Sequence, residues 1–166
     1  MENNEKNLFD RDRALALDDA ALLGECEQDF FKSTGKGGQK RNKSSSAVRL
    51  IHLPSGTAVT DCSERSQAAN RKAALAKLRL EMALQFRVTP ASPPERPECG
   101  LTNADYFLTV AHLFDVLCDN AWAPAPSAAS MQLSSSKLLK LLARDPRVFG
   151  RFNDFRRAAG MSILHP

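Results

Sequence analysis

The sequence predicts a mixed α+β fold: a small antiparallel sheet packed on a long helix, followed by a small C-terminal helical module. Two β-branched and apolar stretches, 47–53 and 57–62, flank Pro54-Ser55-Gly56, which is typical of a hairpin turn. Residues 66–86 then have the apolar periodicity of an amphipathic helix. Three more helical patterns follow the proline-rich stretch 88–100.

The N-terminal part of the chain predicts two short elements before the hairpin. Residues 1–17 are charged and without periodicity, so we expect an acidic, disordered leader. Residues 17–24 predict a short helix, because Asp18 and Asp19 lie near its start. Residues 26–32 predict a first strand that runs into a glycine-rich segment.

The long helix has one buried face. Ala74, Leu78 and Met82 recur every four residues, which places them on the same side of a helix. The basic residues of the stretch are expected to point elsewhere: Arg71, Lys72 and Arg79.

Four segments are predicted along the chain: the leader 1–17, a domain 18–87 with the sheet and the long helix, a linker 88–100 and a helical module 101–166. Four prolines in 88–100 interrupt any regular structure.

Each helix of the C-terminal module has its own start signal. Thr102 and Asp105 resemble a capping box, Ser134 opens the second pattern, and Asp145 precedes Pro146 at the third. The connection between the first two helices contains Pro124 and Pro126.

Composition and charge exclude several classes of protein. No apolar run approaches the roughly 20 residues of a membrane span, and no secretory h-region follows Met1. The four cysteines and three histidines are scattered, so no zinc site is predicted and reduced, buried cysteines in the cytoplasm are expected. Residues 1–31 carry 3 basic and 9 acidic side chains, 32–87 carry 12 and 3, and 88–166 carry 8 and 7. This local excess of positive charge is typical of a nucleic-acid binder.

The glycine-rich segment 33–43 lies at the centre of this positive charge. It has three glycines within four positions, three lysines and one arginine, and no acidic residue. Glycines allow a close approach of the backbone to another molecule. The segment is therefore suited to entering a confined, polyanionic place.

Several short motifs follow in a fixed order, and together they resemble the Gly-Gly-Gln domain of class I peptide chain release factors. The resemblance covers about residues 25–82. The motifs are Gly37-Gly38-Gln39, Asn42-Lys43, Ala47-Val48-Arg49, Leu53-Pro54-Ser55-Gly56 and Glu64-Arg65-Ser66-Gln67.

The resemblance implies hydrolysis of the peptidyl-tRNA ester in the peptidyl transferase centre, with Gly37, Gly38 and Gln39 as the catalytic residues and no cofactor. The backbone N–H of Gln39 would stabilise the charge that develops on the carbonyl oxygen, since such donors are preorganised. The sequence has no G-x-S-x-G, H-E-x-x-H or P-loop motif that would compete.

Basic residues beside the catalytic motif are expected to contact phosphates of rRNA or tRNA. Asn42 is equally consistent with a turn-forming role. Arg65 and Ser66 are expected to fix the start of the long helix, and His52 is expected to be structural. The predicted RNA-binding residues are Lys36, Lys40, Arg41, Asn42 and Lys43.

The segments outside the resemblance are short for a domain that reads stop codons, so the chain resembles the codon-independent relatives that rescue stalled ribosomes. Those relatives commonly end in a basic disordered tail, whereas helices are predicted here. Expected partners are the large-subunit rRNA, peptidyl-tRNA and a glutamine methyltransferase acting on Gln39, with a monomeric cytoplasmic protein and no membrane. The alternatives are a non-catalytic ribosome- or RNA-binding factor, and a factor that acts on aberrant tRNAs off the ribosome.

Overall fold

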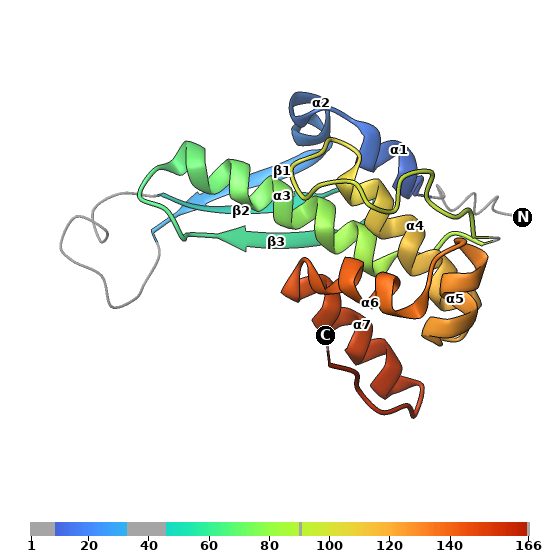
Figure 1. The fold of residues 1–166 in the computed structure, drawn as a ribbon. Coiled ribbons are helices and arrows are strands. Elements are labelled where there is room, and N and C mark those ends of the chain that lie inside the picture. Colours follow the sequence, from blue (N-terminus) through green and yellow to red (C-terminus); the bar gives the residue numbers. More distant parts are fainter. Residues whose placement is uncertain (1–8, 33–45, 90, 166) are drawn as a thin grey trace, which may run out of the picture. The chain divides into compact units, whose positions relative to one another are not determined.

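A computed structural model describes residues 9–32, 46–89 and 91–165. The chain divides into two compact units, Met1–Met82 and Ala83–Pro166. The first contains a three-stranded sheet and the second is helical in its described part (Figure 1). The predicted α+β class is confirmed.

The sheet of the first unit is antiparallel, with the strands in the order β1-β2-β3. The strands are β1 (Cys26–Phe31), β2 (Ala47–His52) and β3 (Thr57–Asp61), each within a residue of its predicted end. The β2–β3 turn contains Gly56 at φ 69°, a conformation that favours glycine. The hairpin predicted from the turn sequence is confirmed.

The long helix α3 (Gln67–Gln85) runs along one face of the sheet (Figure 1). Its start is fixed by Ser66, whose Oγ accepts a hydrogen bond from the N–H of Ala69 at 3.4 Å. Every second residue of β2 is fully buried in this unit. The three α3 residues that were predicted to lie on the buried face of the helix are fully buried too. This core contains Val48, Leu50, His52, Ala74, Leu78 and Met82.

Two short helices precede the sheet, and one of them corrects the predicted leader. Residues 11–16, expected to be disordered, form α1 (Arg11–Ala16), while residues 1–8 lie outside the described residues. The helix predicted over 17–24 forms as α2 (Asp19–Gly24) and begins two residues later, after Asp18, whose side chain accepts a hydrogen bond from the Ala21 N–H. Gly24 is the last helical residue.

Arg79 explains why the first turns of the chain are ordered. Its guanidinium is buried and donates to the carbonyl oxygens of Leu15 at 3.0 Å and Leu17 at 2.8 Å, and to Asp19 at 3.0 Å. The expectation that Arg79 points away from the core is therefore wrong. The side chain ties the connection between α1 and α2 to the middle of α3.

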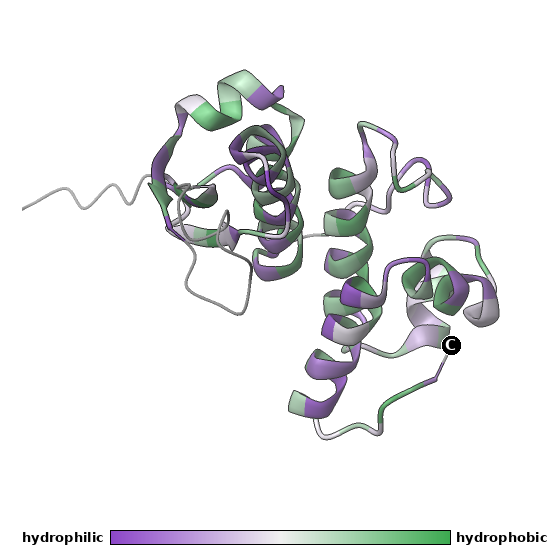
Figure 2. Cartoon of the chain, turned by 90° about the vertical axis from the view of Figure 1, so that its left-hand side faces the viewer, coloured by the Kyte–Doolittle hydropathy of each residue, from purple (hydrophilic) through white to green (hydrophobic). Residues whose placement is uncertain are grey.

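The second unit contains four helices where three were predicted: α4 (Tyr106–Asp119), α5 (Pro124–Ser130), α6 (Ser135–Ala143) and α7 (Pro146–Ala158). Hydrophilic and hydrophobic residues mix along them, as amphipathic helices require (Figure 2). The predicted caps Ser134 and Asp145 are confirmed, since each side chain accepts a backbone N–H.

Two predictions for this unit are wrong. Helix α4 begins at Tyr106, and Asp105 makes no side-chain cap, so the expected capping box does not form. The residues that were expected to form a connection with Pro124 and Pro126 instead form the helix α5. Pro124 lies at its first helical position, where the missing N–H has no consequence.

An aromatic cluster fills part of the second unit. Trp122 and Phe155 stack with ring centroids 4.3 Å apart, and Phe114 packs edge-on against both. Trp122 has φ 62°, a strained value for a large side chain. The buried Arg156 donates to the Trp122 carbonyl at 2.7 Å and stabilises this turn.

The proline-rich segment 88–100 belongs to the second unit, and its described residues, 88, 89 and 91–100, form no helix or strand. It is tied to α4, because the N–H groups of Val88 and Ala91 donate to the carboxylates of Asp115 and Asp119 at 3.1 and 2.9 Å. The predicted linker therefore has fixed contacts instead of lying free.

Two further features bear on the class of protein. Among the described residues, the model contains no helix long and apolar enough to cross a membrane. The four cysteines are free thiols and only half-buried, not fully buried as expected. Burial, followed by the nearby charge of Glu25, raises the pKa of Cys26 to about 11, so this thiol is uncharged near neutral pH.

Candidate functional site

All eight predicted site residues, from Lys36 to Lys43, lie outside the described residues. The structure describes both ends of the chain that lead into this segment. The segment follows Lys32, directly after the end of β1, and is followed by Ser46, the residue before β2. The site is therefore characterised here through the elements that hold its two ends.

Asn70, on the second turn of α3, holds the returning end. Its Nδ2 donates to the carbonyl oxygens of Ser46 at 2.7 Å and Glu64 at 2.9 Å, and its Oδ1 accepts the Glu64 N–H at 2.7 Å. The side chain is fully buried. The Asn70 side chain thus connects Ser46, where the chain re-enters the sheet, to the turn between β3 and α3.

Asp61 holds the same turn through Ser63 and Lys77. Its Oδ1 accepts hydrogen bonds from the N–H and Oγ of Ser63 at 2.9 and 2.7 Å, and its Oδ2 pairs with Lys77 Nζ at 2.6 Å. Burial raises the pKa of Asp61, but the hydrogen bonds from Lys77 and Ser63 outweigh it and hold this pKa below its ordinary value.

His52 lies at the opposite end of the strands. It is fully buried, with Nε2 3.1 Å from the Glu25 carboxylate and Nδ1 2.8 Å from Ser55 Oγ. The hydrogen bond from Arg13, and then the one from His52, lower the pKa of Glu25. His52 therefore has both ring nitrogens engaged within the fold, which agrees with a structural role.

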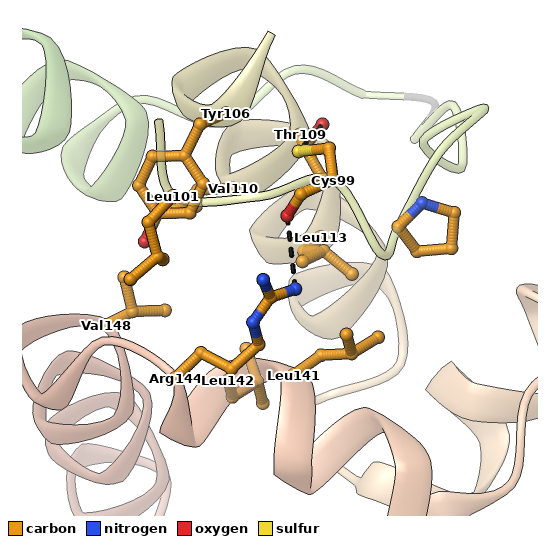
Figure 3. Close-up of a pocket in the computed structure, with 11 residues that line it drawn as sticks. Cys99, Leu101, Tyr106, Thr109, Val110, Leu113, Leu141, Leu142, Arg144 and Val148 are labelled. Carbon is orange, nitrogen blue, oxygen red and sulfur yellow. Dashed lines mark hydrogen bonds between the residues drawn. The ribbon is translucent and has the colours of Figure 1, made fainter. Parts of the chain in front are cut away.

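The second unit contains a small cavity between α4 and the helices α6 and α7 (Figure 3). Tyr106, Leu113 and Leu142 line it, and Arg144 reaches across it to the Cys99 carbonyl at 3.1 Å. Its volume of about 20 Å³ is room for about one water molecule. It is too small for a substrate.

Asn70 was not among the predicted site residues. The signal available was an Asn in a helical pattern, four residues after a capping Ser, where such residues compete with the helix backbone unless they have a specific partner. Its partners are distant in sequence, so only the fold reveals them.

Comparison with known proteins places the candidate site within a described domain. Residues 23–98 match the model of the RF-1 domain. This segment belongs to the RF-1 domain family. The match includes the whole sheet, the whole of α3 and the predicted catalytic motif.

Curated relatives resemble the same part of the chain. Peptide chain release factor 1 of Xylella fastidiosa (strain 9a5c) is 48% identical over 54 residues, 32% of this chain and 15% of the relative. Peptide chain release factor 1 of Thermoanaerobacter pseudethanolicus (strain ATCC 33223 / 39E) is 53% identical over 75 residues, which are 43% of this chain and 21% of the relative. Peptide chain release factor 2 of Frankia casuarinae (strain DSM 45818 / CECT 9043 / HFP020203 / CcI3) is 43% identical over 68 residues, which are 41% of this chain and 19% of the relative. The chain thus spans about a fifth or less of these relatives.

Replacing Asn70 by Ala should destabilise the RF-1 domain by about 3 kcal/mol. The substitution leaves the Ser46 carbonyl and both backbone groups of Glu64 without their partner, and a buried unsatisfied polar group costs about 1–3 kcal/mol. Urea unfolding followed by circular dichroism measures the change. A loss below about 0.5 kcal/mol would show that the side chain does not hold this turn.

The stability of the domain should fall with acid through Asp61. Because the folded-state pKa of Asp61 is depressed, its stabilising effect is present above the unfolded-state value of 3.8 and is lost as the pH falls through the folded-state pKa. Asp61→Asn should therefore lower the free energy of unfolding by roughly 1–3 kcal/mol at pH 7 and much less at pH 2. Urea unfolding at the two pH values tests this. Equal differences at both would contradict it.

Proposed function

We propose that this protein hydrolyses the ester bond of peptidyl-tRNA on the ribosome. The observation that carries the proposal is the RF-1 domain over residues 23–98 with Gly37-Gly38-Gln39 intact within it. The strands that lead into and out of the motif, β1 and β2, are formed as the residue pattern predicts.

In the proposed mechanism, water attacks the ester carbonyl that links the peptide to the tRNA. The backbone N–H of Gln39 donates a hydrogen bond to the oxyanion that develops there. Gly37 and Gly38 allow the close approach of the backbone, and the Gln39 side chain shapes the pocket for water. The neighbouring cations Lys36, Lys40, Arg41 and Lys43, with Asn42, bind phosphates of rRNA or tRNA.

We further propose that release does not depend on a stop codon, and that the factor rescues stalled ribosomes in the cytoplasm. The support is the second unit, residues 83–166, which forms its own helical core and lies mostly beyond the RF-1 match. Its role would be recognition of the stalled state. Gln39 would be a substrate of a glutamine methyltransferase, and the protein would act as a monomer.

Peptide release from defined ribosome complexes tests the proposal. Ribosomes carrying labelled peptidyl-tRNA are programmed with a stop codon, a sense codon or a message that ends at the P site. Comparable release on the sense or truncated message indicates rescue, and release restricted to the stop codon contradicts codon independence.

The strong positive charge of residues 32–87 also suits a factor that binds ribosomes or RNA without turnover. Binding to all three complexes with no release on any would favour this second function over hydrolysis.

A further inference from the structure

The basic residues of the first unit fall into two groups that differ in their partners. Arg13, Lys77 and Arg79 are ion-paired with Glu25, Asp61 and Asp19, and Arg11 is paired with Asp12. Five other described cations have exposed side chains that make no hydrogen bond or ion pair to any described residue. We call them the loop-end cations: Lys32, Arg49, Arg65, Arg71 and Lys72.

The loop-end cations share one end of the unit. β1 ends, β2 begins, β3 ends and α3 begins at this end, from which the segment 33–45 leaves (Figure 1). Lys32 directly follows β1 and Arg65 precedes α3 by two residues. Arg71 and Lys72 lie within about 8 Å of the start of α3, at 1.5 Å per residue. Arg49 lies about 10 Å along β2 from Ser46.

Acidic residues are few at this end. Asp29 lies opposite Arg49 in the β1–β2 register, and Glu64 precedes Arg65, but neither forms an ion pair with a described residue. The opposite end differs. The segment 10–27, which contains α1, α2 and the start of β1, carries six acidic and two basic side chains. The unit is therefore positive at the end from which the Gly-Gly-Gln segment leaves and negative at the other.

We propose that the loop-end cations are a second RNA-binding surface, which contacts ribosomal RNA phosphates around the place that the Gly-Gly-Gln segment enters. This inference rests on the proposed function for the identity of the RNA. Unpaired guanidinium and ammonium groups lose no internal partner when they bind a phosphate, so they are free to replace condensed counterions. The acidic far end is repelled by the same RNA, and this opposition orients the unit with its loop end toward the ribosome.

Two double variants test the location of the surface. Arg71→Gln with Lys72→Gln removes one Arg and one Lys from the loop end. Arg96→Gln with Lys140→Gln removes the same charges from the second unit. Both of these side chains are also exposed and make no hydrogen bond or ion pair to the part of the chain that the structure describes. The two variants have the same net charge, so any difference between them comes from position.

The measurement is the dissociation constant for empty large ribosomal subunits between 50 and 200 mM KCl. The loop-end variant should lower the slope of log affinity against log salt by about 1.4–1.8, at 0.7–0.9 per phosphate. Its affinity would then fall about tenfold less than that of the wild type across this range. The control variant should keep the wild-type slope.

Two results would overturn the proposal: equal changes in both variants, or an unchanged slope in the loop-end variant. Weaker binding with that unchanged slope would indicate a protein contact. Circular dichroism of both variants confirms the fold. Because this assay measures binding and not peptide release, the proposal of an RNA-binding surface and the hydrolase proposal can fail independently. A wild type that binds with the expected slope but releases no peptide contradicts only the hydrolase proposal.

Discussion

Replacing Gly38 by Ala, or Gly37 by Ala, should reduce the rate of peptide release by about 10²–10³. In the proposed mechanism, the added Cβ would restrict the backbone and obstruct the approach of the Gln39 N–H to the ester. A donor aimed at a developing oxyanion contributes this much because it is preorganised and acts only in the transition state. The rate is measured as single-turnover release from ribosomes saturated with each variant.

Ribosome binding by the glycine variants is the control for this prediction. Because the substitutions leave every cation in place, affinity for the ribosome should remain near that of the wild type. Release at the wild-type rate by both variants would contradict the hydrolytic role of the motif. Loss of binding in parallel with loss of release would instead indicate that the glycines serve docking.

The parts of the fold that follow from local patterns were predictable from the sequence. The β2–β3 hairpin was predicted because Gly56 and the two residues before it are typical of a hairpin turn. Helix α3 was predicted because Ala74, Leu78 and Met82 recur with the helical period. Caps such as Ser134 were predicted because the cap and its partner N–H are three residues apart.

The parts that depend on distant partners were not predictable. α1 has only six residues, which is too short to be stable from propensity alone, and its order depends on Arg79 more than 60 residues away. α5 was missed because Pro124 is a helix breaker except at the first position, and its place in the helix is visible only in the fold. Asn70 belongs to the same group.

Removal of the second unit should separate docking from chemistry. A chain that ends after Phe86 keeps the sheet, the packed part of α3 and the buried Leu50, Leu78 and Met82 of the first unit. We expect it to fold cooperatively, to release peptide at the wild-type rate when saturating, and to need a much higher concentration to reach half of that rate on stalled ribosomes.

A point variant makes the same test without shortening the chain. Phe114 is fully buried and packs on Trp122 and Phe155, so Phe114→Ala should destabilise the second unit by about 3–5 kcal/mol and leave the first unit folded. Both variants should raise the concentration for half-maximal release and preserve the saturating rate. If the shortened chain fails to fold, the Phe114 variant still decides the question. Full activity of either folded variant at low concentration would contradict a recognition role, because the chemistry would then need only the RF-1 domain.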